Sequence, residues 1–282
     1  MSLALIARTL RQAASARQCL LCAVQREAEE HYLWFWAHEG TNDGAAIGKL
    51  LQSRGFCARH ARQAGHAYER EWGDGLGIAN TYEYLLARLS TDLAELSLPK
   101  NAARHREARQ GRRRAVEERL GAQAPCPACA SADNAVRSAA RALLKELEND
   151  AAGNDWRALY RESAGLCLPH VRLALELSGY PRAAEFLLTA ERESVGALLD
   201  DVREYIRKCD YRFRDEPKGA EQDSWIRALA KYAGILEPTD GRCRCADPLP
   251  GRGDAAAQGG ANSPSAQKGD SYERKDRVRT SH

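Results

Sequence analysis

The chain has 282 residues, 44% of them apolar, and a formal net charge of +3 at pH 7. This length and apolar content allow a buried core, and the near-neutral charge gives no general reason to expect nucleic acid or an anionic membrane as partner. No apolar run approaches the roughly 20 residues that span a bilayer, so we expect no membrane association.

The nine cysteines are odd in number and accompany no export signal. A disulfide framework therefore fits poorly, and free thiols in a cytoplasmic protein are the better interpretation. Alternating β-branched runs are scarce, whereas Ala, Leu, Arg and Glu dominate. We therefore predict an all-α fold.

Helical periodicity and Gly-rich breaks divide the first part of the chain, residues 1–98, into a series of helices. Residues 1–16 form an amphipathic lead-in. The expected helices that follow run from Cys19 to about 38, over 45–53, from Cys57 to about 72, and over 78–96. We interpret this part as a first metal-binding helical unit.

Residues 99–124 are rich in arginine, and Arg104, Arg106, Arg109, Arg112, Arg113, Arg114 and Arg119 outnumber the acids there. Such a segment could bind the phosphates of RNA or DNA. No aromatic residues are interleaved to stack on bases, so we favour a solvated helical connector, with nucleic-acid binding as an alternative.

The second unit, residues 125–208, repeats the helix order of the first. Its expected helices cover 127–147, a short stretch with Trp156 and Tyr160, a helix from Cys167, and a long helix after Pro181. Residues 209–235 should form a helical cap that packs Trp225 and Leu229 on the bundle. Residues 236–282 have almost no apolar content, which predicts a disordered tail.

One cysteine and histidine pattern occurs twice, as Cys-x2-Cys followed by Gly-apolar-Cys-x2-His. The gap between the two halves of the pattern is 34 residues in the first copy and 37 in the second. Ser53, Gly55, Cys57 and His60 map onto Ser163, Gly165, Cys167 and His170 with a constant offset of 110. This match indicates an internal duplication.

Three thiolates and one imidazole form a complete tetrahedral ligand set for Zn²⁺. A Cys-x2-Cys turn at the start of a helix favours thiolates through the free N–H groups and the helix dipole. We therefore predict two zinc sites, one in each unit, with cross-unit pairing left open. The preferred ligands are Cys19, Cys22, Cys57 and His60 at one site, and Cys126, Cys129, Cys167 and His170 at the other.

A [4Fe-4S] cluster is the main alternative, because thiolates dominate the ligand set. Covalent haem attachment is excluded, since Ala23 and Ala130 stand where it requires histidine. The sequence shows no nucleophile and base pair, phosphate loop or paired catalytic carboxylates, and does not favour an enzyme. It assigns no role to Cys209, Cys243 or Cys245.

The duplicated motifs, together with Tyr211-Arg-Phe-x-x-Glu-Pro217 and Asp223-Ser-Trp225, resemble a prokaryotic helical family of uncharacterised function. The resemblance covers about 19–234 and departs at Leu20, where the second copy has Pro127. It implies a bacterial cytoplasmic protein and supplies no reaction. We expect a metal-binding scaffold whose partner is another protein, with an iron–sulfur redox protein or a nucleic-acid accessory factor as alternatives.

Overall fold

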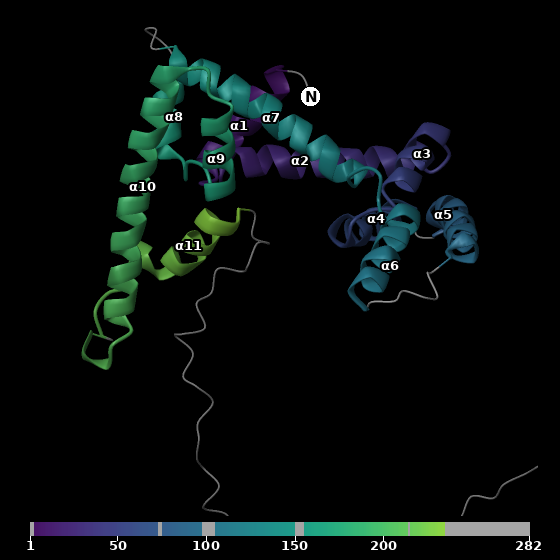
Figure 1. Cartoon of the computed structure of the whole chain (residues 1–282). Coiled ribbons are helices and arrows are strands. Elements are labelled where there is room, and N and C mark those ends of the chain that lie inside the picture. Colours follow the sequence, from purple (N-terminus) through teal and green to yellow (C-terminus); the bar gives the residue numbers. More distant parts are fainter. Residues whose placement is uncertain (1–2, 73–74, 98–104, 150–154, 214, 235–282) are drawn as a thin grey trace, which may run out of the picture. The chain divides into compact units, whose positions relative to one another are not determined.

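The computed structural model describes residues 3–72, 75–97, 105–149, 155–213 and 215–234. Within these ranges every regular element is helical, which confirms the predicted all-α fold. The order is α1 (Leu3–Ser15), α2 (Leu20–Phe35), the π-helix η1 (Trp36–Gly40), α3 (Gly44–Gln52), α4 (Ala58–Trp72), α5 (Leu76–Glu95), α6 (His105–Leu120), α7 (Pro127–Glu148), α8 (Trp156–Glu162), α9 (Leu168–Glu176), α10 (Pro181–Lys208), the 3₁₀ turns η2 (Tyr211–Phe213) and η3 (Ala220–Asp223), and α11 (Ser224–Ala233) (Figure 1).

Helices α2 and α7 pack side by side and run antiparallel. Leu21, near the start of α2, shares a hydrophobic core with Leu147 at the end of α7. Trp36, just after α2, shares a second core with Ala128 at the start of α7. Each core thus contains residues from both copies of the duplicated pattern. The unit boundaries at 98, 124 and 208 stay predictions.

Cysteines occupy the N-cap positions of three helices. Cys19 precedes α2, Cys126 precedes α7 and Cys167 precedes α9. Pro127 stands at the start of α7, where its missing N–H and fixed φ suit the first turn. The cysteine motifs therefore lie where the sequence predicted them, at the starts of helices, which have free backbone N–H groups.

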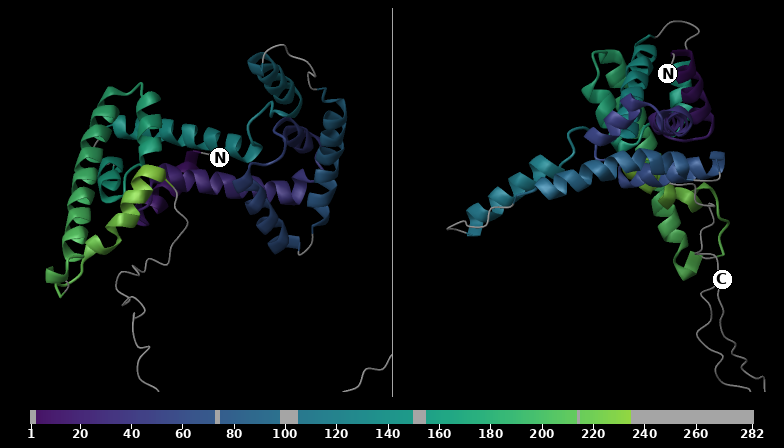
Figure 2. Two further views of the ribbon diagram at one scale, coloured as in Figure 1. Left: turned by 60° about the horizontal axis from the view of Figure 1, so that its bottom comes forward. Right: turned by 90° about the vertical axis from the view of Figure 1, so that its right-hand side faces the viewer.

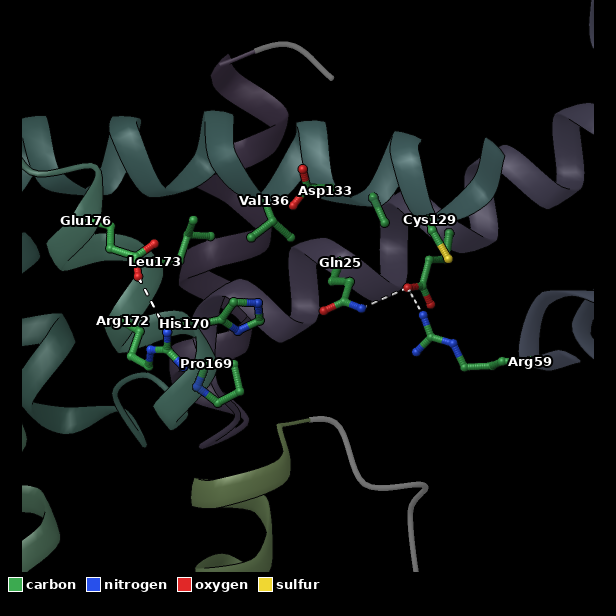
Figure 3. A pocket seen from close by; sticks show the side chains of 12 residues that line it. Gln25, Arg59, Cys129, Asp133, Val136, Pro169, His170, Arg172, Leu173 and Glu176 are labelled. Atoms are coloured by element: carbon green, nitrogen blue, oxygen red, sulfur yellow. Dashed lines mark hydrogen bonds and ion pairs between the residues drawn. The ribbon is translucent and has the colours of Figure 1, made fainter. Parts of the chain in front are cut away.

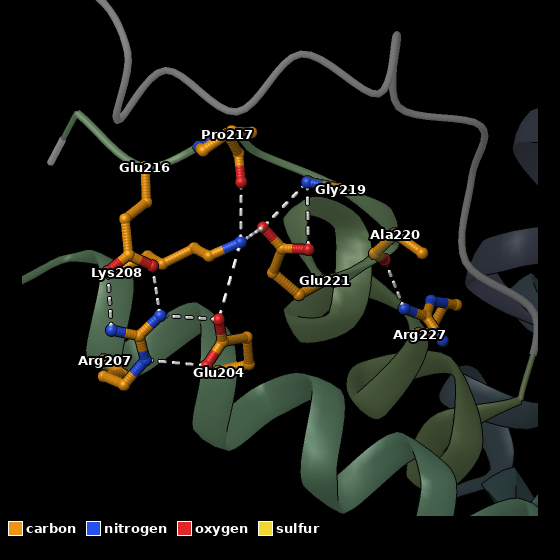
Figure 4. Close-up of polar contacts among 9 residues, drawn as sticks. All are labelled: Glu204, Arg207, Lys208, Glu216, Pro217, Gly219, Ala220, Glu221 and Arg227. Atoms are coloured by element: carbon orange, nitrogen blue, oxygen red, sulfur yellow. Dashed lines mark hydrogen bonds and ion pairs between the residues drawn. The ribbon is translucent and has the colours of Figure 1, made fainter. Parts of the chain in front are cut away.

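The C-terminal part is built around α10. Helix α11 packs against α10 and α9 (Figure 2). Lys208, at the end of α10, donates hydrogen bonds to the Pro217 carbonyl at 2.7 Å and to Glu221 at 3.0 Å (Figure 4). These contacts attach the loop after α10 to the helix that precedes it.

The cap covers Trp225 and Leu229 less completely than expected. Trp225 and Leu229 remain 38% and 53% exposed. Ser224 is the buried residue of α11, and the ammonium of Lys231 lies 2.5 Å from the buried carboxylate of Glu191. In the part of the chain that the structure describes, no helix combines the length and apolarity needed to cross a membrane.

Candidate metal centres

The eight residues of the duplicated pattern gather into two groups of three sulfurs and one imidazole. In each group the possible ligand atoms lie within 4.8 Å of one another. The first group consists of Cys19, Cys22, Cys167 and His170, and the second of Cys57, His60, Cys126 and Cys129. Each Cys-x2-Cys pair therefore meets the Cys-x2-His pair of the other copy, and the preferred pairing within units is wrong.

The physical reason for this crossing is the antiparallel packing of α2 and α7. The start of α2 lies beside the end of α7, and the chain leaving α7 brings Cys167 and His170 back to that place. The start of α7 lies beside the end of α2, near the returning Cys57 and His60. The pairing is thus set by which helix ends are neighbours.

In the first group the Nδ1 atom of His170 faces the three sulfurs. It lies 3.4 Å from Sγ of Cys19, 3.4 Å from Sγ of Cys22 and 3.2 Å from Sγ of Cys167. Sγ of Cys22 and Sγ of Cys167 are 3.7 Å apart. The backbone N–H of Cys167 donates to Sγ of Cys19 at 3.3 Å, an interaction that favours a thiolate.

The second group has the same arrangement. Nδ1 of His60 lies 3.3 Å from the sulfurs of Cys57 and Cys129 and 3.5 Å from that of Cys126. The Cys57 and Cys129 sulfurs are 3.8 Å apart. His60 is fully buried, whereas its three cysteines are only partly buried. In the first group Cys22 and Cys167 are buried, so its sulfurs are better shielded from solvent.

Neighbouring thiols in each group shift one another's pKa values, so that ionisation of one disfavours ionisation of the next. Hydrogen bonds from Cys19 and Cys22 lower the pKa of Cys167 to about 3, and the same contact with Cys167 raises the pKa of Cys22. Burial raises the pKa of Cys129 to about 12 and lowers the pKa of His60. Because clustered thiolates repel one another, a bound cation would be needed to hold all three sulfurs ionised.

The glycine before each Cys-x2-His pair has the expected special conformation. Gly55 has a φ of +92° and Gly165 a φ of +65°, in the left-handed region that side chains disfavour. At Gly165 an added Cβ would also come 2.5 Å from Oε1 of Glu191. The tight turn thus requires glycine at 165 for both conformation and space.

Sequence reasoning missed Glu29, which supports the second group. Its carboxylate lies 3.6 Å from Nε2 of His60 and is 3% exposed. The same carboxylate accepts a hydrogen bond from Gln25 at 2.9 Å and another from Arg59. A carboxylate beside the second ring nitrogen favours the tautomer in which Nδ1 is free to bind a metal, although Nη2 of Arg59 lies nearer to Nε2, at 3.3 Å.

Sequence reasoning also missed Gly234 and Glu191, which lie beside the first group. A Cβ at Gly234 would lie 3.3 Å from Sγ of Cys22, so the end of α11 covers this group closely. Glu191 accepts hydrogen bonds from the Leu166 N–H at 2.8 Å and from Tyr160 at 2.5 Å. It therefore fixes the backbone just before Cys167. Neither residue stands near a cysteine motif in sequence, so spacing gave no signal.

The remaining cysteines take no part in these groups as far as the structure describes them. Cys209 is exposed and caps the end of α10. Cys243 and Cys245 lie outside the described residues, as does the predicted disordered tail.

The fold and the two groups define an all-helical protein with two Cys₃His clusters that could bind metal ions. A model for a family of unknown function, DUF6062, matches residues 9–239, and the chain belongs to this family. No curated protein and no solved structure matches the chain.

Proposed function

We propose that the protein binds two structural zinc ions, one in each Cys₃His group, and serves as a binding or scaffold module. Three thiolates and an imidazole are the donor set that structural zinc sites use. Each group supplies four donors, so no position is left open for a reacting water or substrate. A structural role fits this closed set better than a catalytic one.

The observation that carries the proposal is the spacing of the donor atoms. With zinc–sulfur bonds of about 2.3 Å, two sulfurs at the corners of a tetrahedron are about 3.8 Å apart. Sγ of Cys22 and Sγ of Cys167 are 3.7 Å apart in the first group, Sγ of Cys57 and Sγ of Cys129 are 3.8 Å apart in the second, and all the donor atoms of each group lie within 4.8 Å of one another. Ligands of a [4Fe-4S] cluster bind different iron atoms and need wider spacing, so these distances support a single ion over a cluster.

Zinc at these positions would join parts of the chain that are far apart in sequence. One ion would connect the starts of α2 and α9, and the other the starts of α4 and α7. Because the ligands come together only in the folded chain, metal binding would contribute directly to the free energy of folding.

A binding role is supported by apolar side chains on the surface. Leu86 and Leu93 on α5 are 61% and 52% exposed, seven residues apart and thus on one helix face. A helix of a partner protein could cover such a face. We propose a protein partner on this ground, in a cytoplasmic setting where the thiols stay reduced.

The test is metal analysis of the full chain purified under anaerobic conditions. We expect a colourless protein with two equivalents of zinc. A brown protein with iron, acid-labile sulfide and broad visible absorbance would instead establish the cluster alternative. A folded chain that purifies with neither zinc nor iron would contradict both.

A further inference from the structure

The two metal centres differ in what the second ring nitrogen of the histidine faces. Nε2 of His60 has the carboxylate of Glu29 at 3.6 Å and Nη2 of Arg59 at 3.3 Å. The duplication relates Cys22 on α2 to Cys129 on α7 by an offset of 107, and the same offset relates Glu29 to Val136. An apolar residue therefore stands beside the first group where the second group has its carboxylate.

His170 consequently has an unused donor. His170 is 8% exposed, and its Nδ1 faces the three sulfurs of the first group. With Nδ1 on a metal, Nε2 carries a proton. Among the described residues no acceptor lies within hydrogen-bonding distance of this Nε2. Histidines that bind metals nearly always donate this proton to a carboxylate, carbonyl or water.

A pocket opens beside this imidazole. It has a volume of 390 Å³ and lies between α2, α7 and α9 (Figure 3). Val136, His170 and Arg172 line one part of it, and Arg59 and Cys129 line the other. The pocket thus extends from the first metal centre to the second.

We propose that this pocket binds a carboxylate group from outside the chain, which accepts a hydrogen bond from Nε2 of His170 and pairs with Arg172. The inference rests on the proposed function, since metal on Nδ1 sets the protonation of Nε2. The bound carboxylate would take the role that Glu29 has at the second centre, where it contacts both His60 and Arg59.

The pocket is lined by two guanidiniums, Arg59 and Arg172, and by three carboxylates, Glu29, Asp133 and Glu176, so an incoming carboxylate depends on what each of these charges is already paired with. Asp133 is paired with Arg137 at 2.8 Å, and Glu29 is held by Arg59. Among the described residues, Arg172 has one ion pair, a long contact of 3.7 Å with Glu176, and the Arg172 side chain is 73% exposed. Its guanidinium can therefore exchange Glu176 for an incoming carboxylate at little cost, because exposed pairs contribute little.

The experiment follows the imidazole nitrogens of the zinc-loaded full chain by ¹⁵N NMR. The chain has seven histidines, and His170→Cys, which keeps four zinc donors, assigns the His170 signals by their loss. Two probes are titrated separately: glutarate, and a short neutral peptide with a single glutamate. Saturation by glutarate would identify a small acid as the source, and saturation by the peptide alone an acidic side chain of a protein.

We expect a saturable shift of His170 Nε2 with at least one probe and none at His60. Arg172→Ala should weaken binding about tenfold, as the loss of one charge-assisted hydrogen bond does. Val136→Glu should supply the carboxylate internally and abolish the shift, whereas the exposed substitution Glu30→Gln should leave it unchanged.

Zinc at two equivalents with no saturable His170 shift by either probe would overturn this inference and leave the proposed function intact. Equal binding by the wild type and Arg172→Ala would also overturn it. Less than two equivalents of zinc in the starting protein would overturn both. Arg172→Ala keeps the test valid if Val136→Glu does not fold, because Arg172 is exposed.

Discussion

Sγ of Cys19 lies 3.4 Å from Nδ1 of His170, although the two residues are 151 positions apart in the chain. Each candidate metal centre is therefore completed by residues from both copies of the duplicated pattern. Damage to one copy should affect both centres, and loss of either metal should loosen contacts between the copies.

Removal of metal should lower the melting temperature strongly. Structural zinc sites contribute several kcal/mol, and in a chain of this size each kcal/mol shifts the melting temperature by about 2–4 °C. We expect a fall of at least about 10 °C in circular dichroism after chelation, restored by adding zinc. An unchanged melting curve, with metal loss verified by elemental analysis, would contradict a structural role.

Glu29→Gln should weaken zinc binding at the second group only. The substitution removes the charge beside His60 while keeping the side-chain size, and loss of such a supporting carboxylate typically lowers metal affinity about 10–100-fold. Competition with a chromogenic chelator should release one of the two zinc ions earlier than in the wild type. The matched control is Glu30→Gln, the exposed neighbour on α2. Equal release in both variants would rule out this role.

Gly165→Ala should destabilise the fold more than Gly55→Ala. Both positions have positive φ, which costs a residue with a side chain about 1–2 kcal/mol. At Gly55 the nearest atom to an added Cβ is 3.5 Å away, whereas at Gly165 Oε1 of Glu191 is 2.5 Å away and must move. Chemical denaturation of the two zinc-loaded variants compares the losses directly. A larger loss at Gly55 would be incompatible with the packing around Glu191.

The two candidate metal-binding motifs were predictable from the sequence, but their pairing was not. Spacing identified all eight residues, because cysteine and histidine recur at fixed intervals before helical stretches. The gaps of 34 and 37 residues are long enough for the chain to return to its own pair or to another. The choice depends on the antiparallel packing of α2 on α7, which places Leu21 and Leu147 in one core and which no local pattern encodes.

The residues that support the candidate metal ligands could not be predicted from the sequence either. Glu29 stands on an amphipathic helix where an acid is ordinarily solvent-exposed, and only the tertiary arrangement places it beside His60. The exposure of Trp225 and Leu229 has a related cause. The apolar periodicity of a helix indicates which face is apolar, and does not show whether another element covers it.

The loop after α10 should be sensitive to acid through Glu204. The Arg207 guanidinium lowers the pKa of this carboxyl from 4.5 to about 2. A group with a lowered folded-state pKa stabilises the fold above its unfolded pKa, and this contribution is lost as the pH falls. The melting temperature of the wild type should exceed that of Glu204→Gln above pH 4.5, and the difference should shrink as the pH approaches 2.

Comparison with the variant at each pH separates this effect from acid release of metal, which both proteins share. Glu204 is partly exposed, so added salt should reduce the difference. A difference that stays constant from pH 5 to pH 2, the range set by this pKa shift, would show that the Arg207 pair does not act in this way.

The pairing of ligands across the two copies is tested most directly by the zinc content of two double variants. Cys22→Ser with Cys167→Ser changes two ligands of the first group, whereas Cys22→Ser with Cys57→Ser changes one ligand of each group. We predict that the first variant retains one equivalent of zinc and that the second loses both. The opposite result, with both ions lost from the first variant and one kept by the second, would contradict crossed pairing and restore a separate metal site in each copy.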